Sequence, residues 1–388
     1  MTEPLVSRMR AFGTTIFAEM SALALQTGSI NLGQGFPDTD GPAAMLDIAI
    51  QAITTGANQY PPGPGVPELR RAVSDHRAEH YGLSYDPAGE VLVTVGATEA
   101  VAASVLALCE PGDEVVAFEP YYDSYAAAVA LAQARLVAVT MRPVEGRFTF
   151  DPAELRAAVT PRTRAILVNS PHNPTGTVFT RDELIAIADL CRDRDLVAIT
   201  DEVYEHLTFD GAEHIPLATL PGMRERTVMI SSAGKTFSVT GWKTGWVCAP
   251  APLVTAVQTV KQFLTFTAGA PWQLAVAYGL RHELEWVAAL RAGLQDKRDR
   301  LMEGLSAAGF EVLRPAGTYF VQTDIRPLGF TDGLELTRRL PELAGVVAIP
   351  TQVFYDHPER GRPFVRFAFC KREEVIDEAV NRLKRLST

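Results

Sequence analysis

The chain has 388 residues, of which 47% are hydrophobic and 21% are charged. At roughly 150 residues per domain, this length predicts two to three domains, and the composition excludes a disordered, fibrous or membrane-like chain. The 36 basic and 46 acidic residues give a net charge of −10, which argues against a general binder of nucleic acid or anionic membranes.

Neither a signal peptide nor a membrane span is expected. The segment before Thr15 lacks an apolar core, and the most apolar stretch, 126–141, is interrupted by Gln133 and Arg135. The cysteines form no CxxC pair and no Cys/His cluster, which excludes a disulfide framework and a zinc pattern. They are Cys109, Cys191, Cys248 and Cys370. We therefore expect a cytoplasmic protein.

The first forty residues have no strand pattern, and we expect them to pack beside the C-terminal part. From about residue 90, β-branched runs alternate with helical patterns, which predicts βα units around a mostly parallel sheet. The runs are EVLVTVG, EVVAFEP, RLVAVTM, RAILVNSP, LVAITDEVY, TVMISS and GWVCAP. Helices are expected between them near 98–109 and 181–194, the second opened by a capping box of Thr180 and Glu183.

After about residue 251 long helical patterns follow, including one over 286–308 that would bridge two domains. The strand patterns TYFVQTD, VVAIP and FVRFAFC come next, with a last helix from about Glu373. We expect an α/β fold: a large domain whose mostly parallel sheet is covered by helices, and a smaller α+β domain formed by the N- and C-terminal parts. The expected boundaries are 1–45 for the N-terminal segment, 46–285 for the large domain and 286–388 for the small domain.

Two nucleotide-binding interpretations fail. Gly234-Lys235-Thr236 follows a strand, but a phosphate-binding P-loop needs glycine where this chain has Met229. The glycine-rich GQGFPD and GPGVPE do not match GxGxxG, and each carries a proline where a dinucleotide-binding helix should begin.

Three polar residues follow predicted strands. Asp201 ends one parallel strand, Asn173 follows the strand before it, and Lys235 follows a later one. Because open α/β sheets bind ligands at the carboxyl ends of their strands, the three side chains should converge. Taken alone, Asp201 could equally be a helix cap.

The ordered segments NSPHNPTG, TDEVYEHL, SSAGKTFSVTGWKTGW and VRFAFCK carry a resemblance that spans nearly the whole chain. NLGQGFPD, NQYPPGPG, VTVGATEA and EPYYDSY extend it. The chain resembles the fold-type I pyridoxal-phosphate aminotransferases of the aspartate aminotransferase superfamily, class I/II. Within that family it is similar to the kynurenine aminotransferase and cysteine-conjugate β-lyase group, and most similar to the actinobacterial N-succinyldiaminopimelate aminotransferases.

The resemblance implies pyridoxal 5'-phosphate as cofactor and gives four residues roles around its ring. Lys235 would form the Schiff base and carry the proton between the substrate α-carbon and the cofactor. Asp201 would keep the ring nitrogen protonated, and Asn173 and Tyr204 would donate hydrogen bonds to the phenolic oxygen. Without these roles, Lys235 could be a surface ammonium and Tyr204 a half-buried strand residue.

The cofactor phosphate would lie where a strand gives way to a helix. There the backbone N–H groups of Gly96 and Ala97 and the hydroxyl of Thr98 can face a dianion. Ser232 and Lys243 resemble the remaining phosphate ligands of the family. Many relatives carry arginine at the position of Lys243, so a point charge replaces a bidentate clamp.

Two tyrosines complete the implied cofactor site. Tyr122 matches the aromatic residue that stacks on the pyridine ring, where kynurenine-type relatives often have phenylalanine; the alternative is a core aromatic residue. Tyr60 resembles the residue that reaches the phosphate of the neighbouring subunit, which implies a homodimer with shared active sites. Without the resemblance, Tyr60 reads as a turn residue.

Arg366 alternates with apolar neighbours on a predicted strand, so its charge needs a partner. The resemblance implies that it clamps the substrate α-carboxylate, helped by Asn173 and by the backbone at Gly35. A structural salt bridge is the alternative.

Three further residues are considered. The seven histidines show no ligand spacing, His172 is interpreted as a loop residue, and no metal is predicted. Lys261 is a candidate cation for a distal carboxylate of the substrate. Phe266 either lines the pocket of the neighbouring chain or, on stronger grounds, packs in the core.

The sequence therefore predicts an aminotransferase that moves an amino group from an L-amino donor to a 2-oxo acid. The resemblance implies N-succinyl-LL-2,6-diaminopimelate with 2-oxoglutarate, in lysine and diaminopimelate biosynthesis. A kynurenine, glutamine or methionine aminotransferase with β-lyase activity is the alternative. A pyridoxal-phosphate-binding regulator is a third, disfavoured by the lack of a basic DNA-binding module.

Overall fold

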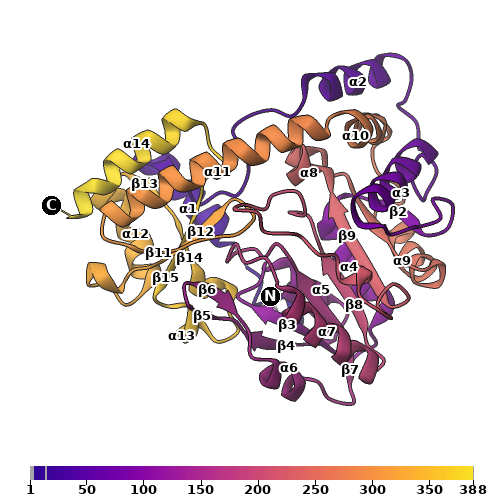
Figure 1. Ribbon diagram of the computed structural model, residues 1–388, viewed down its shortest axis with the longest axis horizontal. Coiled ribbons are helices and arrows are strands. Elements are labelled where there is room, and N and C mark those ends of the chain that lie inside the picture. Colours follow the sequence, from indigo (N-terminus) through magenta and orange to yellow (C-terminus); the bar gives the residue numbers. More distant parts are fainter. Residues whose placement is uncertain (1–3, 14, 388) are drawn as a thin grey trace.

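The computed structural model describes residues 4–13 and 15–387, and its centre is a seven-stranded sheet (Figure 1). The strand order is β2-β10-β9-β8-β7-β3-β4, and only β10 runs antiparallel to its neighbours. The strands are β2 (Val91–Thr94), β3 (Glu114–Glu119), β4 (Arg135–Thr140), β7 (Thr163–Asn169), β8 (Val197–Asp201), β9 (Thr227–Ser232) and β10 (Gly245–Cys248). Each of the seven apolar runs forms one strand, which confirms the predicted mostly parallel sheet.

Successive residues of the central strands face opposite helical layers, as the two-residue period of a strand requires. Val116 and Phe118 of β3 pack in one core, and Val115 and Ala117 pack in the other. One layer contains α6 (Pro152–Ala158) and α7 (Arg181–Asp193), and the capping box of Thr180 and Glu183 is present. The opposite layer contains α4 (Gly96–Leu108), α5 (Ser124–Leu131) and α9 (Ala251–Leu264).

Three more helices pack together near the β2 edge of the sheet (Figure 1). They are α2 (Ala43–Thr54), α3 (Pro67–Tyr81) and α10 (Ala270–His282). A one-turn helix, α8 (Ala233–Thr236), follows β9 directly, and a hairpin of β5 (Arg142–Val144) and β6 (Arg147–Thr149) follows β4.

A second, four-stranded antiparallel sheet has the order β11-β12-β15-β14. Its strands are β11 (Glu311–Leu313), β12 (Phe320–Asp324), β15 (Phe364–Ala368) and β14 (Ile349–Pro350). The helices near it are α1 (Ile16–Thr27), α12 (Gly333–Ala344), α13 (Pro358–Gly361) and α14 (Glu373–Leu383).

The N-terminal region does contain a strand, contrary to the expectation from its sequence. β1 (Ile30–Asn31) pairs in parallel with β13 (Val346–Val347). The single run VVAIP therefore splits into β13 and β14, which belong to different sheets. A two-residue strand carries no readable period, so only the pairing partner defines it.

The long helix α11 (Leu284–Ala307) connects the two parts (Figure 1). Val287 near its start packs with the core around α3 and α10, whereas Leu301 and Leu305 pack in the core of the smaller sheet. The exact domain boundaries stay a prediction. Among the described residues, the model has no helix with the length and apolar character needed to cross a bilayer.

Candidate active site

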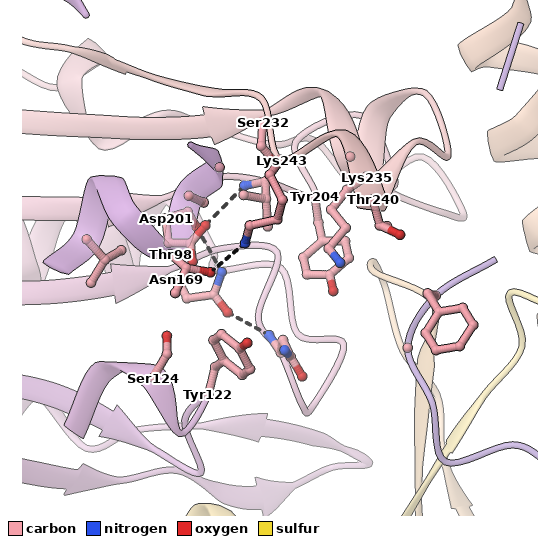
Figure 2. Close-up of a pocket in the computed structure, with 18 of the residues that line it drawn as sticks. Thr98, Tyr122, Ser124, Asn169, Asp201, Tyr204, Ser232, Lys235, Thr240 and Lys243 are labelled. Carbon is pink, nitrogen blue, oxygen red and sulfur yellow. Dashed lines mark hydrogen bonds between the residues drawn. The ribbon is translucent and has the colours of Figure 1, made fainter. Parts of the chain in front are cut away.

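A cavity of about 310 Å³ lies at the carboxyl ends of β7, β8 and β9, next to the first turn of α4 (Figure 2). This edge is where open α/β sheets bind ligands. The predicted site residues that line the cavity are Gly35, Gly96, Ala97, Thr98, Tyr122, Asn173, Asp201, Tyr204, Ser232, Lys235, Lys243 and Arg366. Segments from both parts of the chain thus meet at one cavity.

Asp201 is the last residue of β8 and is buried at the base of the cavity. Burial raises the pKa of its carboxyl group, and the Tyr125 hydroxyl opposes this shift by donating to Oδ2 at 2.6 Å. The Asn169 amide donates to the Asp201 carbonyl oxygen at 2.8 Å. A carboxylate held in this way favours a cationic group placed against it.

Lys235 lies in α8, and its side chain enters the same cavity (Figure 2). Burial lowers the pKa of its amine to about 8. Its Nζ lies 6.0 Å from the ring centre of Tyr204 and 5.8 Å from that of Tyr319. The lowered pKa leaves a usable fraction of neutral, nucleophilic amine near neutral pH.

The opposite end of the cavity is suited to an anion. Gly96 begins α4 with φ +73°, and a Cβ there would lie 3.2 Å from Lys243 Nζ. The Lys243 ammonium donates to the Thr98 hydroxyl at 3.4 Å. An N-terminal helix turn, two hydroxyl groups including that of Ser232, and an ammonium together make a phosphate-sized site.

Arg366 is fully buried on β15 and faces the cavity without a carboxylate partner among residues 4–13 and 15–387. Its two terminal nitrogens donate to Asn173 Oδ1 and to the Gly33 carbonyl, each at 3.0 Å. The Phe320 ring lies 4.0 Å below the guanidinium, and burial lowers the Arg366 pKa to about 10. The structural salt bridge considered from the sequence is not formed, so the cation is available to a bound anion.

Three residues considered for the site do not line this cavity. Tyr60 is 82% exposed, and its ring packs edge-on against Phe266 at 5.3 Å. Phe266 is itself 50% exposed, so the expectation that it packs in the core is wrong. Lys261 is buried in α9 and donates to the Phe266 carbonyl at 2.8 Å, away from the cavity, so we no longer consider it a substrate ligand.

Two residues that support Asp201 were not predicted from the sequence. Asn169 is the last residue of β7 and lies opposite Asp201 in the sheet register, a position that the strand pattern could have indicated. Tyr125 belongs to α5, and only the tertiary fold places its hydroxyl on the carboxylate. Tyr122 lies beside Tyr125 at the cavity wall, with ring centres 5.9 Å apart.

Comparison with known proteins decides the family. The sequence-family model described as aminotransferase class I and II matches residues 27–383. The chain belongs to the class I and II aminotransferases. This family is pyridoxal-phosphate-dependent, and the cavity fits the cofactor: it offers an amine with a lowered pKa, a buried carboxylate and an anion site at a helix start.

Individual relatives agree over almost the full chain. The chain is 55% identical to the probable N-succinyldiaminopimelate aminotransferase of Mycobacterium tuberculosis, over 98% of each sequence. The solved structure of N-succinyldiaminopimelate aminotransferase from that organism matches with a TM-score of 0.97, covering 98% of this chain and 100% of that one. The methionine aminotransferase of Escherichia coli is 40% identical over 98% of each sequence.

Proposed function

We propose that this aminotransferase moves the amino group of N-succinyl-LL-2,6-diaminopimelate to 2-oxoglutarate, in lysine and diaminopimelate biosynthesis. The observation that carries the substrate assignment is the 55% identity over 98% of the chain to the mycobacterial relative of that name. A methionine donor is the second candidate, favoured by the 40% identity to the Escherichia coli enzyme.

Bound pyridoxal phosphate supplies an electron-accepting ring that stabilises negative charge on the substrate α-carbon. Lys235 Nζ would hold the cofactor covalently and, as a free amine, would take the substrate α-proton as a base and return it as an acid. Its location in the short helix after β9 keeps this nitrogen in the cavity, where burial favours the neutral amine.

Asp201 would keep the cofactor ring nitrogen protonated. Its buried carboxylate is fixed by Tyr125, so a cationic N–H placed against it is favoured. Tyr204 and Asn173 would donate hydrogen bonds to the phenolic oxygen, and Tyr122 would pack against the ring. The first turn of α4, with Thr98, Ser232 and Lys243, would hold the phosphate.

Arg366 orients both substrates by their α-carboxylate. The Asn173 oxygen and the Phe320 ring fix the guanidinium, and its Nε has no hydrogen-bond partner among the described residues, so the group can still donate to a carboxylate. The backbone at Gly35 lies beside this position, and a Cβ there would meet the Phe320 ring at 2.5 Å. A side chain at residue 35 would therefore displace the ring that supports Arg366.

The active form is a homodimer in which Tyr60 enters the partner's site. Tyr60 and Phe266 form an exposed aromatic pair beside Phe263, which is 85% exposed, and Leu264, which is 48% exposed. Such an apolar patch indicates a protein interface. The expected cytoplasmic location also stays a prediction.

The substrate assignment is tested by absorption spectroscopy of the purified protein loaded with pyridoxal phosphate. The band of the lysine-linked cofactor should disappear fastest with N-succinyldiaminopimelate and return with 2-oxoglutarate. Methionine, kynurenine and glutamine are the comparison donors. Faster loss of the band with methionine would leave the family assignment intact and overturn the proposed substrate.

A further inference from the structure

Three histidines from two distant segments meet on the side of the large sheet that faces α3, outside the active-site cavity. His76 and His80 lie one turn apart on α3, and their rings stack with centres 4.3 Å apart. His206 follows β8 in the chain, and its Nε2 lies 3.0 Å from Nε2 of His76. A pair of histidines at positions i and i+4 on one helix face is a metal-chelating arrangement.

Two buried carboxylates and one buried guanidinium lie beside the histidines, and His214 Nε2 lies 3.1 Å from one of the carboxylates, that of Glu202. Glu205 accepts two bonds of 2.6 Å from Arg77, and the second buried carboxylate, Glu202, lies 3.9 Å from the same guanidinium. Both carboxylates are almost fully buried, so water screens them little. Ser231 and Tyr81 also donate to Glu205, which makes it a fixed counter-charge.

His76 and His206 share one hydrogen bond, and the other ring nitrogen of His76 has no partner among the described residues. His76 is 2% exposed, and this unpartnered atom is its Nδ1. In a hydrogen bond between two neutral imidazoles, one Nε2 carries the hydrogen and the other accepts it. The two rings must therefore be in different tautomers. A metal ion between the two Nε2 atoms would replace this hydrogen, and the ligand atoms of His76, Glu205 and His206 all lie within 4.8 Å of one another.

We propose that His76 and His206 form a zinc-class transition-metal site, with water completing the coordination and Glu205 supplying charge. Two nitrogens bound to tetrahedral Zn²⁺ at about 2.0–2.1 Å are separated by about 3.3 Å. The observed 3.0 Å between the two Nε2 atoms therefore needs only a small widening. Imidazole ligands favour zinc, cobalt, nickel and copper over magnesium and calcium. His80 is exposed, so an ion can enter from its side.

The site lies behind the cofactor site rather than in it. The segment from Asp201 to His206 carries Tyr204 on the active-site side and His206 on the metal side. Ser231 holds Glu205, and the next residue, Ser232, lines the active-site cavity. A bound ion would therefore cross-link α3 to the segment after β8 and stabilise the fold at this point.

The test uses the holoenzyme without a histidine tag, stripped of metals and titrated with Co²⁺ and then Zn²⁺. We expect saturable visible d–d absorption from one Co²⁺ per chain, displaced by Zn²⁺, and a rise in the unfolding temperature on Zn²⁺ addition. His206→Gln should weaken binding by about 100-fold or more, because it removes a ligand while glutamine can still hydrogen-bond to His76. His76→Gln should do the same, and His282→Ala is the matched control because His282 lies at the exposed end of α10.

The proposal is overturned if the metal-stripped chain shows no saturable Co²⁺ absorption. It is equally overturned if His206→Gln binds Co²⁺ and Zn²⁺ as tightly as His282→Ala does. Because His206 is only partly buried, its variant stays informative even where His76→Gln folds poorly.

Discussion

Among residues 4–13 and 15–387, three arginines are fully buried, and the one in the active site has different partners from the other two, which we call the framework arginines. Arg77 forms two bonds of 2.6 Å to Glu205, and Arg298 forms bonds of 2.8 and 2.9 Å to Asp210. Arg366 instead contacts an amide oxygen and a carbonyl oxygen. The framework arginines are thus neutralised within the chain, and the active-site arginine is not.

The pKa shifts follow this difference. Glu205 holds the pKa of Arg77 above its ordinary value, whereas burial lowers the pKa of Arg366 to about 10. Burying a cation without an anion is unfavourable, so a carboxylate that binds beside Arg366 would relieve this cost. Arg77 and Arg298 therefore stabilise the fold, whereas Arg366 is left to bind a substrate.

The largest effect is expected from Lys235→Ala, which removes both the covalent link and the proton carrier. Amino transfer should fall by about 10³-fold or more. The free energy of unfolding should hardly change, because the lost amine is a buried cation without an ion-pair partner among the described residues. Steady-state rates measure the loss of amino transfer, and urea unfolding measures the change in the free energy of unfolding. A strongly destabilised variant would show that Lys235 stabilises the fold, as the framework arginines do.

Arg77→Met should lower stability and leave catalysis unchanged, the reverse of Lys235→Ala. It leaves the Glu205 carboxylate buried without its partner, which should lower the free energy of unfolding by about 3–5 kcal/mol. The remaining folded protein should keep its specific activity, because Arg77 does not line the cavity. Urea unfolding measures the first effect, and activity per folded molecule measures the second.

Arg366→Gln should reduce kcat/KM by roughly 10²–10³-fold, because truncating a hydrogen-bonded charge pair costs about 2–5 kcal/mol. The loss should be shared by amino donors and by 2-oxo acids, since both carry the carboxylate. Arg298→Gln is the matched control, and it should change stability rather than kcat/KM. A donor-only loss would contradict a common carboxylate site.

A smaller effect concerns pH. With a pKa of about 8, the free Lys235 amine gains its neutral form as pH rises, so capture of pyridoxal phosphate by the apoprotein should accelerate tenfold per unit below pH 8 and level off above it. Stopped-flow absorption across this range measures the rate. A rate still rising steeply up to pH 10 would show an ordinary lysine pKa.

The sequence predicts the large sheet because each strand is a buried β-branched run, and it predicts the long α11 because its apolar period is sustained. It does not predict β1, nor that the run VVAIP divides into β13 and β14 in different sheets, because these two-residue strands depend on pairing across most of the chain. The family resemblance names the cavity residues, but Tyr125 reaches Asp201 only through the packing of α5. His76 and His80 have the i, i+4 spacing of a helical pair, but the sequence does not indicate the whole cluster because His206 lies far from them in the chain.

The central claim is that Arg366 is a buried cation whose partner is the substrate. The most direct test compares the unfolding temperatures of the unchanged protein, Arg366→Met and Arg77→Met, each with and without 2-oxoglutarate. We expect Arg366→Met to unfold at or above the temperature of the unchanged protein and to lose its stabilisation by 2-oxoglutarate. Arg77→Met should unfold earlier and keep that stabilisation. An Arg366→Met variant that unfolds early and still responds fully to 2-oxoglutarate would contradict the account.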